Sequence, residues 1–350
     1  MQENDSLEID FDGVKFKNPF WVGSGPTSGT ADKIIQALKA GWGGVVIKTV
    51  GDSIVRKGVR PMYAAMRDQN KDLVVFENIE LITEDNLETW DRYIRTVYHE
   101  IPDAPIIFSI MGSADISEWA KLARWSEDRG ANLIELNFGC PHGEPEKRSG
   151  AYISQHPDLV YEYTKEVVQS VGVPVIAKLS PNVTEITEIA KNAERAGAKA
   201  VSAINTVSCL MGVDIEREML FPPVFGYTTY GGLSGPGVKP IGLKAVSSIY
   251  NNTKLTISGI GGISNWTNAV EYIMCGATSV QVVTDTIMHG FNQIKEWTSS
   301  MADYLKRHNY DSLDDIRGKL AGKIKEYSYL ENLISERDSI DDELRKIREV

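Results

Sequence analysis

Cysteine is scarce in this chain, whose 350 residues include only Cys140, Cys209 and Cys275. An odd number of cysteines without paired spacing argues against a disulfide framework and favours free thiols in a reducing compartment. Three thiolates are also too few for the usual four ligands of an iron–sulfur cluster. We therefore expect a cytoplasmic protein without disulfides and without a metal site.

Positive charge and long apolar runs are also scarce. The chain has 37 Lys and Arg against 48 Asp and Glu, a formal net charge of −11. This balance argues against a nucleic-acid surface, where Lys and Arg must neutralise phosphates. No apolar run reaches the length of a membrane span, and the acidic stretch 1–12 does not look like a signal peptide. We expect neither a nucleic-acid nor a membrane partner.

A dinucleotide-binding fingerprint is missing as well. The turn after the first predicted strand is Ser24-Gly25-Pro26, and not a G-x-G-x-x-G loop. This absence counts against a doubly wound open sheet, which is the alternative fold. We also find no internal repeat.

Eight short apolar segments, each followed by a segment with helical spacing, are present instead. Short apolar runs between turn residues predict buried strands, and periodic apolar residues predict helices. The alternation predicts the α/β class and a (β/α)8 barrel, in which ligands bind at the carboxyl ends of the strands. The predicted strands are 20–23, 45–47, 105–110, 133–138, 173–179, 200–204, 255–258 and 279–283; the predicted helices are 32–40, 83–100, 116–129, 157–171, 184–196, 241–250, 265–274 and 287–306.

Four segments do not belong to these units. Residues 13–20 are expected to form a small hairpin over one end of the barrel, and 51–81 and 207–239 are long excursions. We divide the chain into a barrel domain, 1–310, and a helical tail, 311–350. In the tail, Ser339 could cap a helix whose stripe of Ile340, Leu344 and Ile347 docks on the barrel or, alternatively, on a partner subunit.

The stretch after the fourth strand contains the first candidate site. Gly139 and Pro141 end the strand, so Asn137 and Cys140 lie at its carboxyl end. A carboxamide can pair with the amide edge of a flat ligand, and a thiol can transfer a proton near neutral pH. The alternative is an Asn that closes a turn and a Cys that packs as a small apolar residue.

Glycines and cations mark the ends of other strands. Gly261 and Gly262 after the seventh strand, with Val283 and Thr284 after the eighth, predict a phosphate site, because bare backbone N–H groups can point at an anion. Tight turns are the alternative.

Two lysines, Lys48 and Lys178, end the second and fifth strands. An anionic reduced flavin would explain both, because charge placed near its ring tunes its chemistry. A Schiff-base lysine, as in aldolases, and an ion pair between Lys178 and Glu135 are the alternatives.

Amide and hydroxyl side chains form a third group. Asn78, Asn137 and Asn205 each follow an apolar segment, and Glu80 and Thr206 lie beside them. Together these side chains could surround one planar ligand with alternating N–H and C=O groups, although Asn is also common in turns.

These segments together resemble the flavin- and pyrimidine-binding part of the dihydropyrimidine dehydrogenases, within the dihydroorotate dehydrogenase superfamily. The similarity runs in order over about residues 14–305. The matching motifs are Asn18-Pro19-Phe20, Ala40-Gly41-Trp42-Gly43, Lys48-Thr49, Asn78-Ile79-Glu80-Leu81-Ile82, Ser109-Ile110-Met111, Glu135-Leu136-Asn137, Cys140-Pro141-His142-Gly143, Ala177-Lys178-Leu179, Pro181-Asn182-Val183-Thr184, Asn205-Thr206-Val207-Ser208, Thr228-Thr229-Tyr230-Gly231-Gly232, Ser234-Gly235 and Gly261-Gly262-Ile263.

The resemblance implies FMN as the cofactor and a pyrimidine as the small-molecule substrate. It implies that Cys140 gives a proton to C5 of the pyrimidine while flavin N5 passes a hydride to C6. The implied flavin contacts are Ser24, Gly25, Lys48, Lys178, Gly235, Gly262 and Thr284, and the implied pyrimidine contacts are Asn78, Glu80, Asn137, Asn205 and Thr206.

Departures from the family keep alternatives open. Residues 144–149, in the expected active-site loop, are more charged than the family's glycine-rich version, which puts the substrate in doubt. The NADPH, FAD and iron–sulfur domains of the family's large form do not fit in this chain, so electrons must come from a partner subunit, a ferredoxin or a small molecule. The alternatives are a dihydroorotate dehydrogenase-like enzyme on another cyclic amide and a tRNA dihydrouridine synthase, and an assembly of identical chains is compatible with the sequence.

Overall fold

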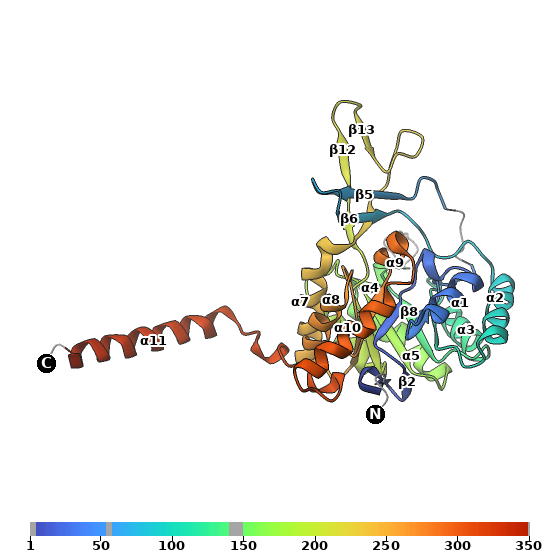
Figure 1. Cartoon of the computed structure of the whole chain (residues 1–350). Helices are drawn as coiled ribbons and strands as arrows, with labels where there is room; N and C mark the ends of the chain where they lie inside the picture. The colour runs from blue at the N-terminus through green and yellow to red at the C-terminus, as the bar shows by residue number, and fades with distance from the viewer. Residues whose placement is uncertain (1–4, 54–57, 140–149, 349–350) are drawn as a thin grey trace.

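A closed barrel of eight parallel strands forms the body of the molecule (Figure 1). The computed structural model describes residues 5–53, 58–139 and 150–348, with side chains up to Arg337. The strands close in the order β10-β15-β16-β3-β4-β7-β8-β9, so the predicted (β/α)8 barrel is confirmed. Their bounds are β3 Phe20–Val22, β4 Gly44–Val46, β7 Ile106–Ile110, β8 Leu133–Asn137, β9 Val175–Leu179, β10 Ala200–Ala203, β15 Thr256–Ile260 and β16 Ser279–Val282.

Among the described residues, eight α-helices surround this barrel, and three further α-helices lie at its ends or outside it. The surrounding helices are α1 Ala31–Ala40, α2 Leu87–Glu100, α3 Ile116–Glu127, α5 Pro157–Ser170, α6 Ile186–Arg195, α7 Lys239–Asn252, α8 Trp266–Met274 and α10 Ile294–Arg307. The additional ones are α4 Ala151–Ser154, α9 Thr284–His289 and α11 Tyr327–Arg348. The prediction of one helix over 287–306 is wrong, because the chain ends α9 at Gly290, which has a φ of +80° that disfavours any other residue.

Burial explains why these segments form a barrel. All five residues of β7, β8 and β9 are buried, as expected of parallel strands with helices outside and side chains inside. Each helix that surrounds the barrel buries part of its surface; in α2 the buried stripe is Trp90, Ile94 and Val97, which lie one turn apart on the same face.

A hairpin closes the end of the barrel that is opposite the strands' carboxyl ends. Its strands are β1 Ile9–Phe11 and β2 Val14–Phe16. A hairpin is therefore present, but it lies a few residues before the predicted range 13–20. The displacement follows from Asp12-Gly13, a turn signal at the centre of the hairpin. Phe11 and Phe16 pack on Trp21, with ring centroids 4.8 and 4.6 Å away.

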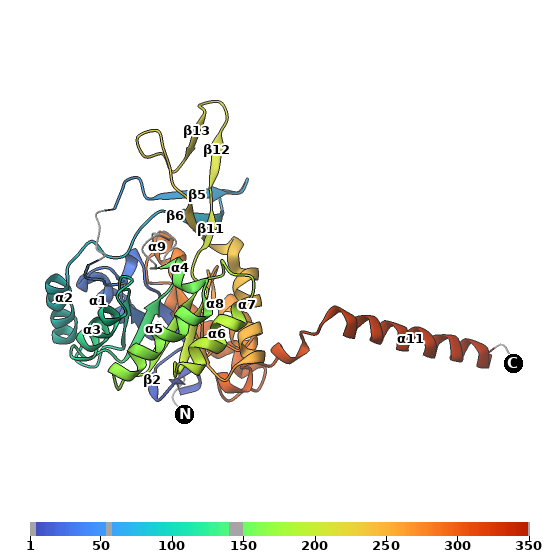
Figure 2. The same ribbon diagram turned by 180° about the vertical axis from the view of Figure 1, so that it is seen from behind.

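The two long excursions meet above the other end of the barrel, where they build a sheet that we call the cap (Figures 1 and 2). Its antiparallel strands lie in the order β11-β14-β6-β5. A separate hairpin of β12 and β13 projects beyond it. The bounds are β5 Tyr63–Arg67, β6 Leu73–Asn78, β11 Val207–Cys209, β12 Gly212–Asp214, β13 Met219–Phe221 and β14 Gly231–Ser234.

The tail begins on the barrel and then leaves it. Leu313 and Ile316 pack in the hydrophobic core, and Ala321 is buried as well. The helix starts at Tyr327 and continues through Ser339, so the prediction of a start at Ser339 is wrong; no Gly or Pro interrupts the segment. The expected docking on the barrel is not seen, because α11 projects away from the barrel in both views (Figures 1 and 2). The side chains of Ile340, Leu344 and Ile347 lie outside the described ones.

The division into domains 1–310 and 311–350 remains a prediction. Within the described ranges, no helix combines the length and the hydropathy that crossing a membrane requires.

Candidate active site

A cavity of about 430 Å³ lies between the cap and the carboxyl ends of the barrel strands. This volume is typical of a small-molecule site. Every described residue that the sequence assigned to a cofactor or a substrate lines it: Ser24, Gly25, Lys48, Asn78, Glu80, Asn137, Lys178, Asn205, Thr206, Gly235, Gly261, Gly262, Val283 and Thr284. Cys140 lies outside the described residues. The fold thus gathers these residues in one place, while their binding roles remain predictions.

A chain of hydrogen bonds connects the strand ends across the barrel. Asn137 Nδ2 donates to Thr49 Oγ1 at 2.9 Å, and Asn205 Nδ2 donates to Asn137 Oδ1 at 3.0 Å. The backbone N–H of Gly139 donates to the same Asn137 oxygen at 3.2 Å. Because Asn137 is 8% exposed, these bonds fix both amide orientations at the cavity surface.

The cap adds a carboxylate to this end of the cavity. Glu80 follows β6, and its Oε1 lies 2.7 Å from Lys48 Nζ, with both side chains about seven-eighths buried. Tyr63 of β5 also contacts Glu80, and burial together with this carboxylate raises the pKa of the Tyr63 hydroxyl. The Lys48–Glu80 pair therefore makes this part of the cavity locally neutral.

Lys178 forms the ion pair with Glu135 that the sequence left open as an alternative. The Lys178 Nζ to Glu135 Oε1 distance is 3.4 Å, and the two side chains are 7% and 0% exposed. A Schiff base needs a neutral amine, so this pairing argues against the aldolase alternative. Lys178 nevertheless lines the cavity, where its ammonium group can face a ligand.

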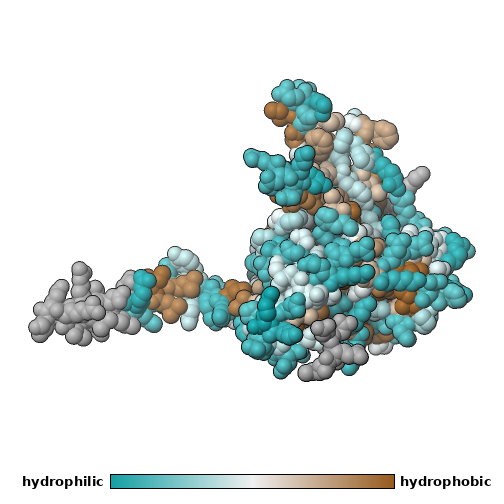
Figure 3. Space-filling model, viewed as in Figure 1, coloured by the Kyte–Doolittle hydropathy of each residue, from teal (hydrophilic) through white to brown (hydrophobic). Residues whose placement is uncertain are grey.

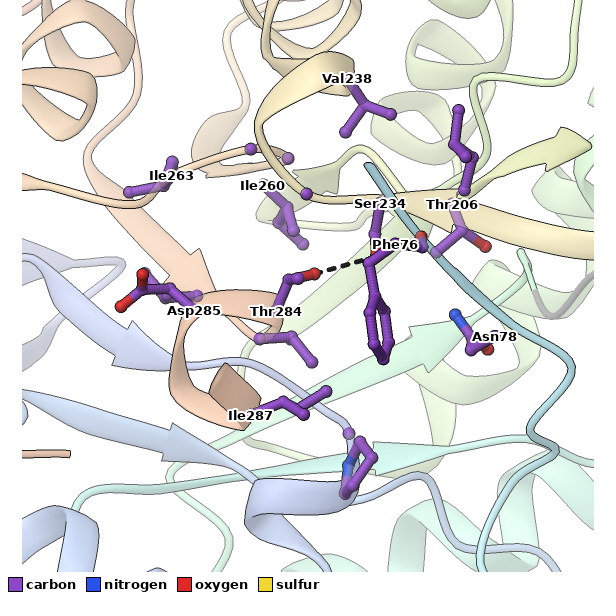
Figure 4. Close-up of a pocket in the computed structure, with 18 of the residues that line it drawn as sticks. Phe76, Asn78, Thr206, Ser234, Val238, Ile260, Ile263, Thr284, Asp285 and Ile287 are labelled. Carbon is purple, nitrogen blue, oxygen red and sulfur yellow. Dashed lines mark hydrogen bonds between the residues drawn. The ribbon is translucent and has the colours of Figure 1, made fainter. Parts of the chain in front are cut away.

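The glycine-lined side of the cavity fits the phosphate of a flavin nucleotide. Gly262 has a φ of +69°, and a Cβ there would lie 2.8 Å from the backbone N of Lys239 and 2.9 Å from the carbonyl O of Gly235. Only glycine fits this position, and Gly235, Gly261 and Gly262 line the cavity with backbone atoms. Thr284 Oγ1 donates to Ser234 Oγ at 2.9 Å beside them (Figure 4). A concave surface lined by backbone N–H groups and hydroxyls is a suitable binding site for an anion.

Apolar side chains complete the cavity and were missed from the sequence. Figure 4 shows Phe76 of the cap facing Thr284, with Ile287 and Ile260 nearby. A flat ring system can lie against such side chains. The apolar run from Leu73 to Phe76, rich in strand-forming residues, is a strand signal, and the two-residue spacing of Phe76 and Asn78 would have placed both on one face of a sheet. Nothing in the sequence indicated that this sheet covers the barrel.

Two titratable groups of the cap, Glu77 and Cys209, are not among the residues that line the cavity. Cys209 Sγ lies 3.4 Å from Glu77 Oε1, and Glu77 is fully buried. Burial raises the pKa of Glu77, and burial together with Glu77 raises the pKa of Cys209 to about 12. A thiol with so high a pKa is a poor nucleophile at neutral pH.

Comparison with known proteins agrees with this geometry. The family model of dihydroorotate dehydrogenase matches residues 6–305. The chain is 36% identical over 324 residues to the chloroplastic dihydropyrimidine dehydrogenase (NADP(+)) of Arabidopsis thaliana, covering 89% of this chain and 76% of the relative. It is 35% identical over 315 residues to the NAD-dependent dihydropyrimidine dehydrogenase subunit PreA of Escherichia coli (strain K12), with the same two coverages.

A second kind of relative is equally similar. The catalytic subunit of dihydroorotate dehydrogenase B (NAD(+)) from Pyrococcus abyssi is 38% identical over 314 residues, which are 89% of this chain and 98% of the relative. The match spans the whole barrel in both kinds of relative. The chain therefore belongs to the dihydroorotate dehydrogenase family of flavoproteins and is an oxidoreductase that acts on CH–CH groups.

Proposed function

We propose that this chain interconverts a pyrimidine base, uracil or thymine, and its 5,6-dihydro form, with FMN as its cofactor. The observation that carries the proposal is the Lys48–Glu80 ion pair of 2.7 Å in the cavity, beside Asn78, Asn137 and Asn205. A neutral pyrimidine presents only N–H and C=O groups, which amides can match. Orotate has an additional carboxylate, which would need a cationic partner. The nearby cation, Lys48, is already paired with Glu80.

The cofactor part of the proposal is supported by the form of the cavity. Gly235, Gly261, Gly262 and Thr284 would hold the phosphate, and Lys48 and Lys178 with the Ser24–Gly25 turn would contact the ring. When bound, the flavin would supply the hydride at N5. The ammonium group of Lys178 would stabilise negative charge on the reduced ring.

Cys140 would donate the proton to C5 of the pyrimidine. It follows Gly139, where a Cβ would lie 2.5 Å from Asn205 Nδ2, so the chain reaches Cys140 directly from the amide cluster. A group that gives a proton in the transition state must lie within hydrogen-bonding reach of the reacting carbon.

Dihydroorotate is the second candidate substrate. The observation in its favour is the 38% identity to the Pyrococcus abyssi catalytic subunit, of which this chain covers 98%. The acidic composition and the matched family favour either small molecule over an RNA, which a tRNA dihydrouridine synthase would bind.

Electrons would reach the flavin from a separate protein. The names of two relatives describe a subunit and a catalytic subunit, and this chain has no dinucleotide fingerprint. We infer that a companion reductase subunit or a ferredoxin-type carrier supplies them.

The substrate is tested by reoxidation of the reduced flavin. Protein loaded with FMN is reduced anaerobically with dithionite and mixed with uracil, thymine or orotate, and the flavin absorbance is followed. We expect uracil or thymine to reoxidise the flavin at least about tenfold faster than orotate, as a locally neutral site predicts. Faster reoxidation by orotate would assign the chain to dihydroorotate, and a protein that does not bind FMN would refute the cofactor.

A further inference from the structure

A buried polar cluster lies at the cavity floor, inside the barrel. Glu135 of β8 is its centre and is fully buried. Its Oε2 accepts hydrogen bonds from Ser202 Oγ and from Gln281 Nε2, each at 2.8 Å, while its Oε1 lies 3.4 Å from Lys178 Nζ. Gln281 is 1% exposed and lines the cavity. The cluster thus connects the predicted ligand contact Lys178 to a glutamine that the sequence did not single out.

The carboxylate determines how the Gln281 amide is oriented. An ionised carboxylate only accepts hydrogen bonds, so the amide NH₂ must face Glu135 and the amide oxygen must point elsewhere. A flipped amide would place two acceptor oxygens in contact. Gln281 Oε1 is therefore an acceptor by necessity, and among the described residues it has no hydrogen-bond partner although it is buried.

An unpaired buried acceptor is costly, and native proteins rarely keep one without a reason. Gln281 stands two residues before Val283 and three before Thr284, on the strand that leads to the predicted phosphate contacts. Gly23 on the neighbouring strand leaves space beside it, because a Cβ at Gly23 would lie 3.3 Å from Gln281 Oε1. The predicted pyrimidine contacts come from other strands and from the cap. The orphaned oxygen therefore belongs to the cofactor side of the cavity.

We propose that Gln281 Oε1 accepts a hydrogen bond from bound FMN, from a ring N–H or a ribityl hydroxyl, and that Glu135 fixes the amide in the accepting orientation. Both groups are donors that a flavin nucleotide carries and that could meet an acceptor at the cavity floor. The inference rests on the proposed FMN cofactor. It makes Gln281 a ligand-binding residue and Glu135 a positioning residue.

The test compares two variants that damage Glu135 equally. Gln281→Met and Ser202→Ala each remove one 2.8 Å hydrogen bond to the same Glu135 oxygen, but only the first removes the orphaned acceptor. The apoproteins are titrated with FMN, and quenching of flavin fluorescence gives Kd. We expect Gln281→Met to raise Kd about tenfold, the effect of one net hydrogen bond, and Ser202→Ala to raise it less than about threefold.

Equal increases in the two variants would overturn the proposal, because Gln281 would then act only by supporting Glu135 or by holding an internal water. If Gln281→Met does not fold, Gln281→Leu replaces it. FMN analogues that lack one donor then identify the group that Gln281 binds. If the donor is the ring N–H, the variant and the parent should bind 3-methyl-FMN with equal affinity. If the donor is a ribityl hydroxyl, the two proteins should bind the corresponding ribityl-deoxy FMN with equal affinity. If the variant keeps its full tenfold defect with both analogues, neither group is the donor and the proposal fails. Failure of the parent to bind FMN would instead refute the proposed cofactor.

Discussion

The barrel and the cap build the two sides of one cavity by different means. The barrel strands are buried throughout, and the polar groups at their ends are tied to one another, as Thr49, Asn137 and Asn205 are. The cap has a more open structure: in β5, the residues Ala65, Met66 and Arg67 are exposed. Among the described residues, Lys48–Glu80 and Ser234–Thr284 join the two regions at the cavity, and Asn78–Gly232 and Ser234–Phe76 are contacts within the cap.

This difference suggests that the barrel positions the reacting groups and that the cap selects the substrate. A fixed set of amides and lysines suits chemistry, which needs groups held at one geometry. A cap attached by a few contacts suits selection of the substrate, because small changes there alter affinity without moving the reacting groups. Changes in the barrel should therefore reduce the rate of reduction, and changes in the cap should alter which substrate is preferred.

The sharpest test of this comparison uses two cysteines. Cys140→Ala, at the position after Gly139, should slow reoxidation of the reduced flavin by uracil about 10²- to 10⁴-fold, because the proposed general acid is lost. Binding of FMN should not change. Cys209→Ala in the cap is the matched control and should change the rate less than about threefold. Stopped-flow absorbance measures both rates, and an unchanged rate in Cys140→Ala would show that this thiol is only packed.

The amide chain of the barrel should give the next largest effect. Asn137→Ala removes the partner of Thr49, Asn205 and Gly139, and buried groups left unpaired cost about 1–3 kcal/mol. We expect kcat/KM for the pyrimidine to fall about 10- to 100-fold.

Asn132→Ala is the control for this change. Asn132 accepts the Ile106 N–H at the opposite end of the same strand, so its loss should lower the melting temperature and leave kcat/KM within about threefold. If both variants lost activity equally, the amide chain would matter only for folding.

The cap should control the choice of substrate through Glu80. Glu80→Gln leaves Lys48 without its carboxylate partner, so an anionic substrate gains a free cation. We expect the ratio of kcat/KM for uracil to that for orotate to fall about tenfold. Glu84→Gln, a nearby carboxylate that is 41% exposed and paired with Arg60, should leave the ratio unchanged. An unchanged ratio in Glu80→Gln would remove the argument from local neutrality.

The smallest effect concerns the stability of the cap. Burial raises the pKa of Glu77, so the folded chain holds this proton more tightly than the unfolded chain does. Its favourable contribution is complete below the unfolded pKa and is lost as the pH rises through the folded one. Glu77→Gln should therefore gain melting temperature relative to the parent as the pH rises above the ordinary glutamate pKa, by about 2 °C for a chain of this size. Scanning calorimetry at several pH values tests this, and a difference that does not depend on pH would contradict a buried charge at Glu77.

The residue pattern predicted those elements whose structure depends on neighbouring residues in the chain. Apolar runs followed by turn residues gave each barrel strand within a few residues, and the residues at their ends, such as Lys178 and Thr284, then had to meet at one edge of the barrel. The errors fell where one residue changes the local outcome. Gly290 splits the helix predicted over 287–306, and the turn at Asp12-Gly13 shifts the N-terminal hairpin.

The barrel could be predicted from local patterns, because each βα unit depends on apolar periodicity and turns within about 40 residues of chain. The cap could not be predicted in this way, because its strands come from distant parts of the chain. Gly232 pairs with Asn78, and Leu233 pairs with Glu77, although these residues are far apart in the sequence and neither excursion has a core of its own. Two further contacts also depend on the folded chain: the ion pair between Glu80 and Lys48, and the hydrogen bond to Glu135 that orients the Gln281 amide. Such pairings depend on which side chains the folded chain brings within hydrogen-bonding distance, and no local pattern encodes that distance.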